Sequence, residues 1–251
     1  MATYKSIRYI VPAEAVEHTD SINALSDVDT ATTAPTDGQI LKWNNTNSKW
    51  YPGDVEEASS ATQKAIFGFG YNENNNFDQN WTNITNLVSS TGVVATDTTG
   101  VGTGRSGLAA AGFGGDKAIF GFGVDGSNNA YSVTNLVSNA GVVATDTTGV
   151  GTARSETLAA AGYGGDKAIF GFGRLTNLRT NITNLVSNTG VVATDTTGVG
   201  TARSETAAAG YGGDKAIFGF GSTDNADTNV TNLVSNTGVV ATDTTGVGTA
   251  R

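Results

Sequence analysis

Short apolar runs alternate with turn-forming polar stretches along this chain, and the same alternation recurs four times. The heptapeptide Lys-Ala-Ile-Phe-Gly-Phe-Gly begins at Lys64, Lys117, Lys167 and Lys215, which gives a repeat of about 48 to 53 residues. Apolar runs bounded by Gly, Asn and Asp indicate β-strands joined by tight turns. A period of this length, rich in Gly and β-formers, predicts an all-β fold of small sheets that stack or surround an axis.

Each repeat is expected to supply four strands. In the third repeat these are the run that begins at Lys167 and residues 182–187, 191–194 and 206–211, with turns rich in Asn, Asp and Gly between them. Hairpins joined by such turns predict one antiparallel sheet per repeat.

Residues 1–63 lack the repeat, so we expect an N-terminal connector followed by a repeat domain over 64–251. A short helical turn is expected at 13–20 and an extended stretch at 25–39. Apolar-aromatic runs on both sides of an Asn-rich turn predict a β-hairpin over 40–51, in which Trp43 and Trp50 can pair.

Composition narrows the set of partners. The formal net charge of -9 argues against nucleic acid, whose phosphates would repel this chain. Cysteine is absent, so disulfides and thiol chemistry are excluded. No apolar run approaches the roughly 20 residues of a membrane helix, and the N-terminus does not resemble a secretory signal peptide. We therefore expect no membrane insertion.

Residues suited to catalysis are scarce. His18 is the single histidine, and it lies outside the repeats without evident partners. No His/Cys cluster with metal-ligand spacing occurs. The stretch from Gly121 to Gly126 matches G-x-G-x-x-G, but β-type sequence follows it where a dinucleotide site needs a helix. The sequence favours a protein that is not an enzyme and binds no cofactor or metal.

Several polar residues recur at fixed places. The recurring charges could surround a channel and bind a ligand or calcium, or they could join neighbouring sheets and turns, and the second interpretation is favoured. They are Arg105, Arg154, Arg203 and Arg251, with Asp97, Asp146, Asp195 and Asp243. The N-x-Thr sequons at Asn80, Asn83, Asn181 and Asn229 are interpreted as products of Asn/Thr-rich turns rather than glycosylation sites.

The copies differ mainly in the stretch that follows each Gly-Phe-Gly. Loops on a rigid scaffold are common places for recognition, although drift in unconstrained loops would give the same pattern. The candidate recognition residues are Tyr71, Phe77, Trp81, Asp125, Asn128, Tyr131, Arg174, Arg179, Asp224 and Asp227.

An apolar strand ending in glycines, a variable loop, the step Thr152-Ala153-Arg154 and an Ala-rich strand turning at Gly-Tyr-Gly-Gly-Asp-Lys resemble the kelch repeat. Gly-Phe-Gly replaces the kelch double glycine, and Val137 and Ala144 stand where Tyr and Trp are usual. The resemblance implies a β-propeller of about four blades over residues 64–251, with a β-rich trimeric fibre as the alternative.

A propeller closes when its first and last segments pair. Residues 57–63 resemble a degraded Ala-rich strand, so we expect them to pair with residues 241–251. Completion of a larger ring by a second chain is the alternative.

Residues 25–54 are similar to connectors of bacteriophage tail-fibre and other virion appendage proteins, and the repeats resemble glycine-rich, kelch-like arrays of marine phage structural proteins. This resemblance implies a virion protein assembled in the host cytoplasm as a homo-oligomer, with a trimer expected. Its N-terminal segment would bind other virion proteins, and its repeats would meet a host-surface glycan or protein. A multivalent carbohydrate-binding lectin is the alternative.

Overall fold

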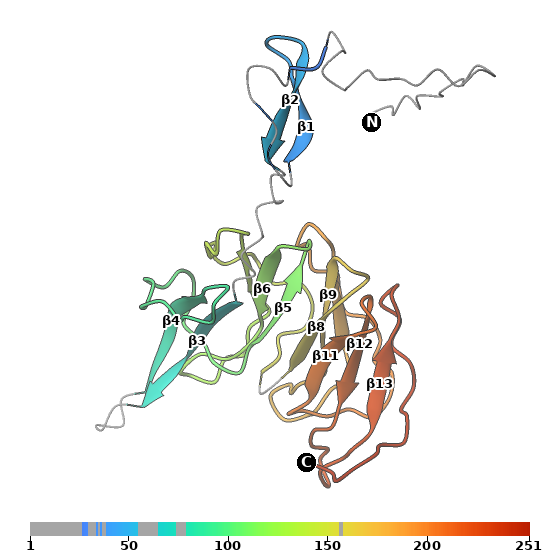
Figure 1. Ribbon diagram of the computed structural model, residues 1–251. Coiled ribbons are helices and arrows are strands. Elements are labelled where there is room, and N and C mark those ends of the chain that lie inside the picture. Colours follow the sequence, from blue (N-terminus) through green and yellow to red (C-terminus); the bar gives the residue numbers. More distant parts are fainter. Residues whose placement is uncertain are drawn as a thin grey trace, which may run out of the picture. The chain divides into compact units, whose positions relative to one another are not determined.

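The computed structural model describes residues 27–29, 34, 36, 39–54, 65–73, 79–155 and 158–251. The chain divides into two compact units, Met1–Ser60 and Ala61–Arg251. Every regular element among the described residues is a β-strand, and all strands pair in antiparallel sheets (Figure 1). The expected all-β class is therefore confirmed. The helical turn expected at 13–20 lies outside the described residues.

The first unit contains an antiparallel hairpin at the place that the sequence predicts. Strand β1 (Gln39–Asn44) pairs with β2 (Lys49–Asp54), and Trp43 lies opposite Trp50 with ring centroids 5.4 Å apart. In the turn, Asn44 Oδ1 accepts the amide of Thr46, and Ser48 adopts a φ of 52°. Both tryptophans remain partly exposed, so they stabilise the hairpin by mutual edge contact.

The second unit contains four successive small sheets. Sheet 1 pairs β3 (Ala65–Glu73) with β4 (Gln79–Val88). Each later sheet has three strands in chain order. Sheet 2 comprises β5 (Ala109–Phe113), β6 (Lys117–Gly121) and β7 (Thr134–Val137); sheet 3 comprises β8 (Ala159–Tyr163), β9 (Lys167–Gly171) and β10 (Thr183–Val186); sheet 4 comprises β11 (Ala207–Tyr211), β12 (Lys215–Gly219) and β13 (Thr231–Val234).

Two details of the expected repeat differ in the structure. The Ala-rich strand pairs forward with the next Lys-Ala-Ile-Phe-Gly strand, so each three-stranded sheet crosses the sequence repeat boundary. Residues 191–194 form no regular strand. Val192 bridges Val186 of β10, and the main-chain amide of Ala193 donates to the carbonyl of Leu185. The side-chain amide of Asn184 donates to the carbonyl of Ala193.

The second Phe of each heptapeptide, which lies between the two glycines, takes the left-handed conformation. Its φ is 64°, 65°, 63° and 62° at Phe69, Phe122, Phe172 and Phe220. This conformation is costly for a residue with a side chain, at about 1–3 kcal/mol. In sheets 2 to 4 it follows the end of the second strand, and in β3 Phe69 lies at a register shift. Three of these rings form edge contacts with Phe120, Phe170 and Phe218 of the neighbouring sheet, at 5.0–5.2 Å.

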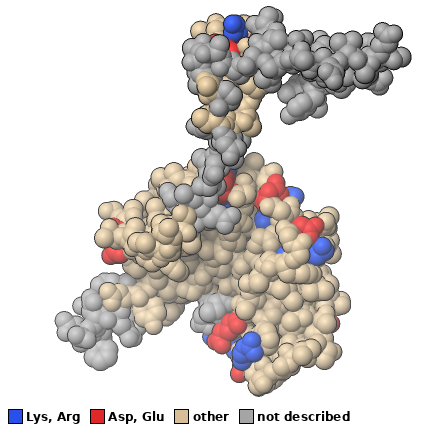
Figure 2. Space-filling model, viewed as in Figure 1, with Lys and Arg blue, Asp and Glu red and all other residues tan. Residues whose placement is uncertain are grey.

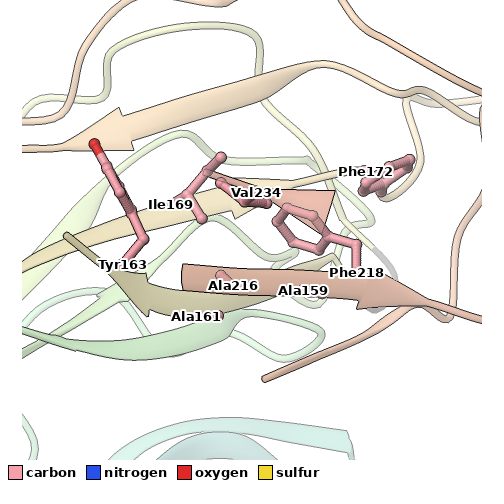
Figure 3. Packing of buried hydrophobic residues seen from close by; sticks show 8 residues of the cluster. All are labelled: Ala159, Ala161, Tyr163, Ile169, Phe172, Ala216, Phe218 and Val234. Carbon is pink, nitrogen blue, oxygen red and sulfur yellow. The ribbon is translucent and has the colours of Figure 1, made fainter. Parts of the chain in front are cut away.

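The hydrophobic core lies between sheets. One cluster joins sheets 2 and 3 around Phe122 and Phe170, and another joins sheets 3 and 4 around Phe172 and Phe218. Figure 3 shows the second cluster, in which small alanines from β8 and β12 lie beside the phenylalanines. The Ala-rich strands β5, β8 and β11 are neighbours. A Cβ placed on Gly162 would lie 3.5 Å from the carbonyl oxygen of Gly112. Small residues thus allow the sheets to pack closely along one edge.

The architecture is β-rich and propeller-like, and none of the sheets among the described residues closes into a ring. Residues 57–63, which are expected to pair with residues 241–251, lie outside the described residues. Within 241–251, Thr244 bridges Thr231, and the carbonyl of Arg251 accepts the amide of Gly221, so this segment binds its own sheet.

Candidate functional site

The four variable loops lie at the same end of their sheets. Loop 1 joins β3 to β4 in sheet 1, and loops 2, 3 and 4 join the second strand to the third in sheets 2, 3 and 4. In the last three repeats, a bridge attaches the first loop residue to the serine after the recurring arginine; the bridges are Ser106–Val124, Ser155–Arg174 and Ser204–Ser222. The scaffold therefore holds each loop in a defined place.

Loop 1 extends as a long hairpin. Tyr71 lies opposite Trp81 with ring centroids 6.2 Å apart, and 55% of Tyr71 is exposed. Trp81 Nε1 donates to Ser106 Oγ at 3.1 Å. The Trp81 ring also covers Gly126 of loop 2, where a Cβ would lie 2.7 Å from the ring. Trp81 thus joins two loops. Phe77 lies outside the described residues.

Asp125 organises loop 2. Its carboxylate accepts hydrogen bonds from the Asn129 side chain, from the amides of Asn129 and Ser127, and from the Tyr131 hydroxyl at 2.9 Å. The bonds from Asn129, then Ser127 and Tyr131, lower the pKa of Asp125 to about 2. The bond to Asp125 raises the pKa of Tyr131. Asn128 is exposed with a φ of 61°. Four polar groups of this loop therefore serve its own conformation.

Loops 3 and 4 are joined by an ion pair. Arg179 donates to Asp224 at 2.7 Å and to Ser204 Oγ at 3.1 Å. The main chain of Arg174 bridges Ser155 and Arg179. In loop 4, Ser222 donates to Asp227 at 2.6 Å. The structure therefore brings together three pairs of candidate residues: Tyr71–Trp81, Asp125–Tyr131 and Arg179–Asp224. The last two pairs hold the loops in their conformation.

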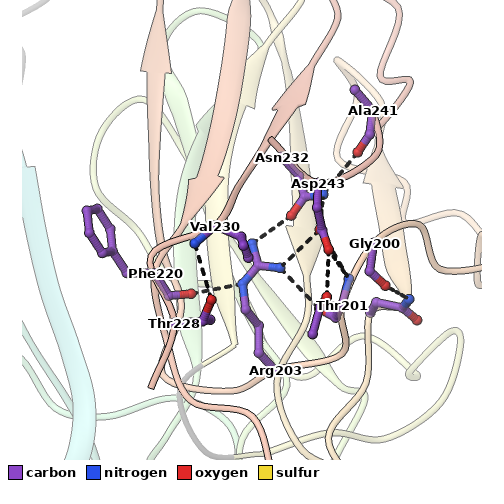
Figure 4. A network of polar contacts seen from close by, with 10 residues as sticks. Gly200, Thr201, Arg203, Phe220, Thr228, Val230, Asn232, Ala241 and Asp243 are labelled. Atoms are coloured by element: carbon purple, nitrogen blue, oxygen red, sulfur yellow. Dashed lines mark hydrogen bonds and ion pairs between the residues drawn. The ribbon is translucent and has the colours of Figure 1, made fainter. Parts of the chain in front are cut away.

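Three of the four recurring arginines, Arg105, Arg154 and Arg203, join consecutive sheets, as the favoured interpretation of the sequence holds. Arg203 is fully buried and lies 4.1 Å over the ring of Phe172 in sheet 3. It donates to the carbonyl of Phe220 and to Asn232 Oδ1, both in the next repeat (Figure 4). Asp243 lies 3.9 Å from the same guanidinium and accepts from Thr201. Arg105 makes the equivalent contacts, and Arg154 shares the Phe, Asn and Asp partners.

Burial shapes the ionisation of these networks. Desolvation lowers the pKa of the three buried arginines, to about 10 for Arg154. Partial burial opposes ionisation of Asp195, but bonds from Thr152 and Asn184 and the charge of Arg154 outweigh it and lower the Asp195 pKa. The equivalent Thr, Asn and Arg partners lower the pKa of Asp146 and Asp243 in the same way. Both partners therefore stay ionised at neutral pH.

The sequence reasoning missed the asparagine of each Thr-Asn-Leu-Val strand. Asn135, Asn184 and Asn232 are fully buried and accept from the arginines. Their recurrence in every repeat is the signal that could have identified them. The sequon asparagines Asn83, Asn181 and Asn229 donate to glycine carbonyls nineteen residues later, which agrees with a role in turns.

In the described part of the chain, no three His, Cys, Asp or Glu side chains are grouped to hold a metal ion, and no helix is long and apolar enough to cross a membrane. A shallow hollow beside Phe67 and Phe120 is lined by apolar residues and glycines. On the face in Figure 2, several acidic side chains have a basic neighbour, and most of the surface is uncharged. His18 lies outside the described residues.

Comparisons with known proteins show the fold alone. No protein-family model matches the chain, and no curated protein matches its sequence. The solved structure of YjhT is similar to this chain with a TM-score of 0.53 at 13% sequence identity, over 78% of this chain and 72% of that chain. The chain is thus similar to YjhT in its β-rich, propeller-like architecture.

Proposed function

We propose that this chain is a structural and recognition component of a bacteriophage particle. Its repeats would form a kelch-like propeller of about four blades, the N-terminal segment would attach to other virion proteins, and the loops would meet the host surface. One observation supports a recognition role most directly. Residues shared by the repeats form the strands and the junctions, whereas the residues that differ gather in loops held at the same end of each sheet.

Loops 1 and 2 touch, as do loops 3 and 4, so each pair can act as one surface. Trp81 of loop 1 covers Gly126 of loop 2, and Arg179 of loop 3 pairs with Asp224 of loop 4. A ligand larger than one loop would meet residues from two repeats. This arrangement suits a macromolecular surface better than a small molecule, because contact with two loops at once needs a ligand larger than one loop.

Two experiments test the proposal. Antibodies raised against the recombinant chain should label intact phage particles at an appendage, and label confined to unassembled material in infected cells would contradict a virion role. Fluorescent protein should bind intact host cells. Replacing residues 174–179 with the loop 4 sequence of residues 222–227 should change that binding. The exchange keeps the scaffold, because these two loops have the same length and anchors.

A carbohydrate-binding lectin is the second candidate, and loop 1 favours it. Tyr71 and Trp81 present a paired aromatic surface, and such rings suit the apolar faces of sugars. Tyr71→Ala should weaken binding of the full chain to a responsive oligosaccharide at least tenfold in calorimetric titration. Leu178→Ala is the control, because Leu178 is 63% exposed on loop 3. Equal effects of the two variants would remove this candidate.

A further inference from the structure

Three internal junctions join the four sheets through one repeated set of contacts. Each sheet has a trailing face, which meets the next sheet, and a leading face, which meets the preceding one. The trailing face supplies the left-handed Phe, the recurring Arg, a Leu and an aromatic residue that ends the Ala-rich strand. The leading face supplies the first Phe of the heptapeptide, an Asn, an Asp and a turn Gly.

The leading face of sheet 1 is open among the described residues. Phe67 is 62% exposed, whereas its equivalents Phe120, Phe170 and Phe218 are 4%, 0% and 0% exposed. Asn86 donates to Asp97 at 2.8 Å, as in the other repeats, but no described arginine lies on this pair. A Cβ at Gly92 would meet nothing within 4 Å, although the equivalent positions 141, 190 and 238 each meet a leucine of the preceding sheet.

The trailing face of sheet 4 is open in the matching places. Tyr211 is 40% exposed, against 3% for Phe113 and 4% for Tyr163. Leu233 is 41% exposed. A Cβ at Gly219 would meet only Thr231, whereas one at Gly171 would lie 2.8 Å from Phe218. The guanidinium of Arg251 lies 3.9 Å over Phe220, so the cation is already placed as in the buried junctions, yet Arg251 is exposed.

We propose that the leading face of sheet 1 binds the trailing face of sheet 4 of a second copy of this chain. Phe67 would cover Gly219 and meet Phe220, Leu233 and Tyr211 would approach the turn at Gly92, and Arg251 would reach Asn86 and Asp97. The two faces match in shape and charge, because three internal junctions bury the same residue types in the same arrangement. Such a head-to-tail contact gives a ring where the rotation closes and an open array otherwise.

A second copy is the occupant because the two faces are exposed in the structure of a single chain. The alternative occupant is the same chain, through ring closure, and the experiment below separates the two. The inference does not depend on the proposed function, since it concerns the sheets and not the loops. Failure of cell binding would leave it intact, and monomeric behaviour would leave the loop proposal intact.

Engineered cysteines can report the contact, since the full chain contains none. In the internal junctions the threonine hydroxyl donates to the aspartate at 2.5–2.6 Å, as in Thr152–Asp195. The corresponding positions across the proposed contact are Thr249 and Asp97. Chains carrying Asp97→Cys alone and Thr249→Cys alone should form a covalent heterodimer when mixed and oxidised, with at least ten times the yield of either variant alone.

Two matched variants test the surface itself. Phe67→Asp in the Asp97→Cys chain should reduce the heterodimer at least tenfold. Val93→Asp in the same chain should not, because Val142, Val191 and Val239 remain 66% exposed beside formed junctions, so this position lies off the contact. Circular dichroism shows that each variant is folded before cross-linking.

The outcomes separate the occupants. A heterodimer that depends on Phe67 supports the proposal. A yield no higher than that of the single variants, or one insensitive to Phe67→Asp, overturns it. So does a chain carrying both cysteines that cross-links within itself at high dilution and yields no cross-linked dimer at high concentration, because that result assigns the contact to ring closure within one chain.

Discussion

At the scale of single residues, the recurring arginine is the main polar stabiliser of each junction. Arg154 is fully buried between Phe122 of one sheet and Asn184 and Asp195 of the next. Removing it leaves a buried amide oxygen and a carboxylate without their cation, and loss of one partner of a buried pair is strongly destabilising. The same residue type at Arg251 is exposed and touches only one ring among the described residues.

We therefore expect Arg154→Ala to lower the free energy of unfolding by about 3 kcal/mol. Arg251→Ala, its control, should lower it by less than about 1 kcal/mol, because it loses one exposed cation–π contact. Urea unfolding of dilute protein measures both values. Equal losses would show that the buried network contributes nothing beyond the stacking on phenylalanine.

Acid should weaken the junctions. The folded-state pKa of Asp146, Asp195 and Asp243 is lowered from the ordinary 3.8, so the unfolded chain binds more protons below that pH. The stabilisation is fully present above about pH 5 and is lost as the pH falls through the folded-state pKa. The free energy of unfolding should therefore decrease from pH 5 toward pH 2.5. Asp195→Asn should have lower stability at pH 7 and a shallower pH dependence, and an unchanged slope would contradict this assignment.

At the scale of elements, glycines in the second strand set the spacing between sheets. Gly171 in β9 lies under the ring of Phe218, where a Cβ would approach Cζ to 2.8 Å. Gly219 holds the same place in β12, but only Thr231 is near it among the described residues, at 3.2 Å. Overfilling a packed junction typically costs about 1–3 kcal/mol.

Gly171→Ala should therefore destabilise the chain by about 2 kcal/mol, and Gly219→Ala by well under 1 kcal/mol, as measured by thermal or urea unfolding of dilute protein. The two strands have the same sequence, so strand propensity cancels in the comparison. A large cost at Gly219 in dilute protein would mean that another part of the same chain covers it.

Much of this local structure was predictable from the sequence. Apolar runs ending in Gly or flanked by Asn and Asp located the first hairpin and the strands that begin at Lys117, Lys167 and Lys215. The expected strand at 191–194 was wrong, because within it only Val192 bridges β10 and the carbonyl of Ala193 accepts from the Asn184 side chain. The partners of the arginines were not predictable, since Asn184 is thirty residues from Arg154 and the two meet only when sheets pack.

The grouping of strands into sheets could not be predicted from the sequence either. A tandem repeat can be divided at any point, and the heptapeptide marks its most conspicuous point but not a sheet boundary. The hairpin turns at Gly114–Gly115 and Gly164–Gly165 join strands from two sequence repeats, with positive φ at both glycines. For the four variable loops, the sequence identified the positions that differ, while the structure shows that Asp125 and Arg179 hold loops 2 and 3 in place.

At the scale of the whole repeat unit, the sheets should differ in local stability. Sheet 3 has neighbours on both faces, and Ile169, Phe170 and Val186 in it are fully buried. Sheet 1 leaves Phe67 exposed, and sheet 4 leaves Tyr211 and Leu233 exposed. In an array where each unit contacts only its neighbours, the end units open at lower free energy than the middle ones.

Amide hydrogen exchange of dilute protein should therefore be slowest in β9, faster in β12 and fastest in β3. Raising the protein concentration should slow exchange in β3 and β12 while leaving β9 unchanged, because a head-to-tail contact covers only the faces that those strands carry. Phe67→Asp should abolish this concentration dependence, and Val93→Asp should preserve it. Protection of β3 equal to that of β9 in dilute protein would instead require the two open faces to meet within one chain, since only then would every sheet have two neighbours.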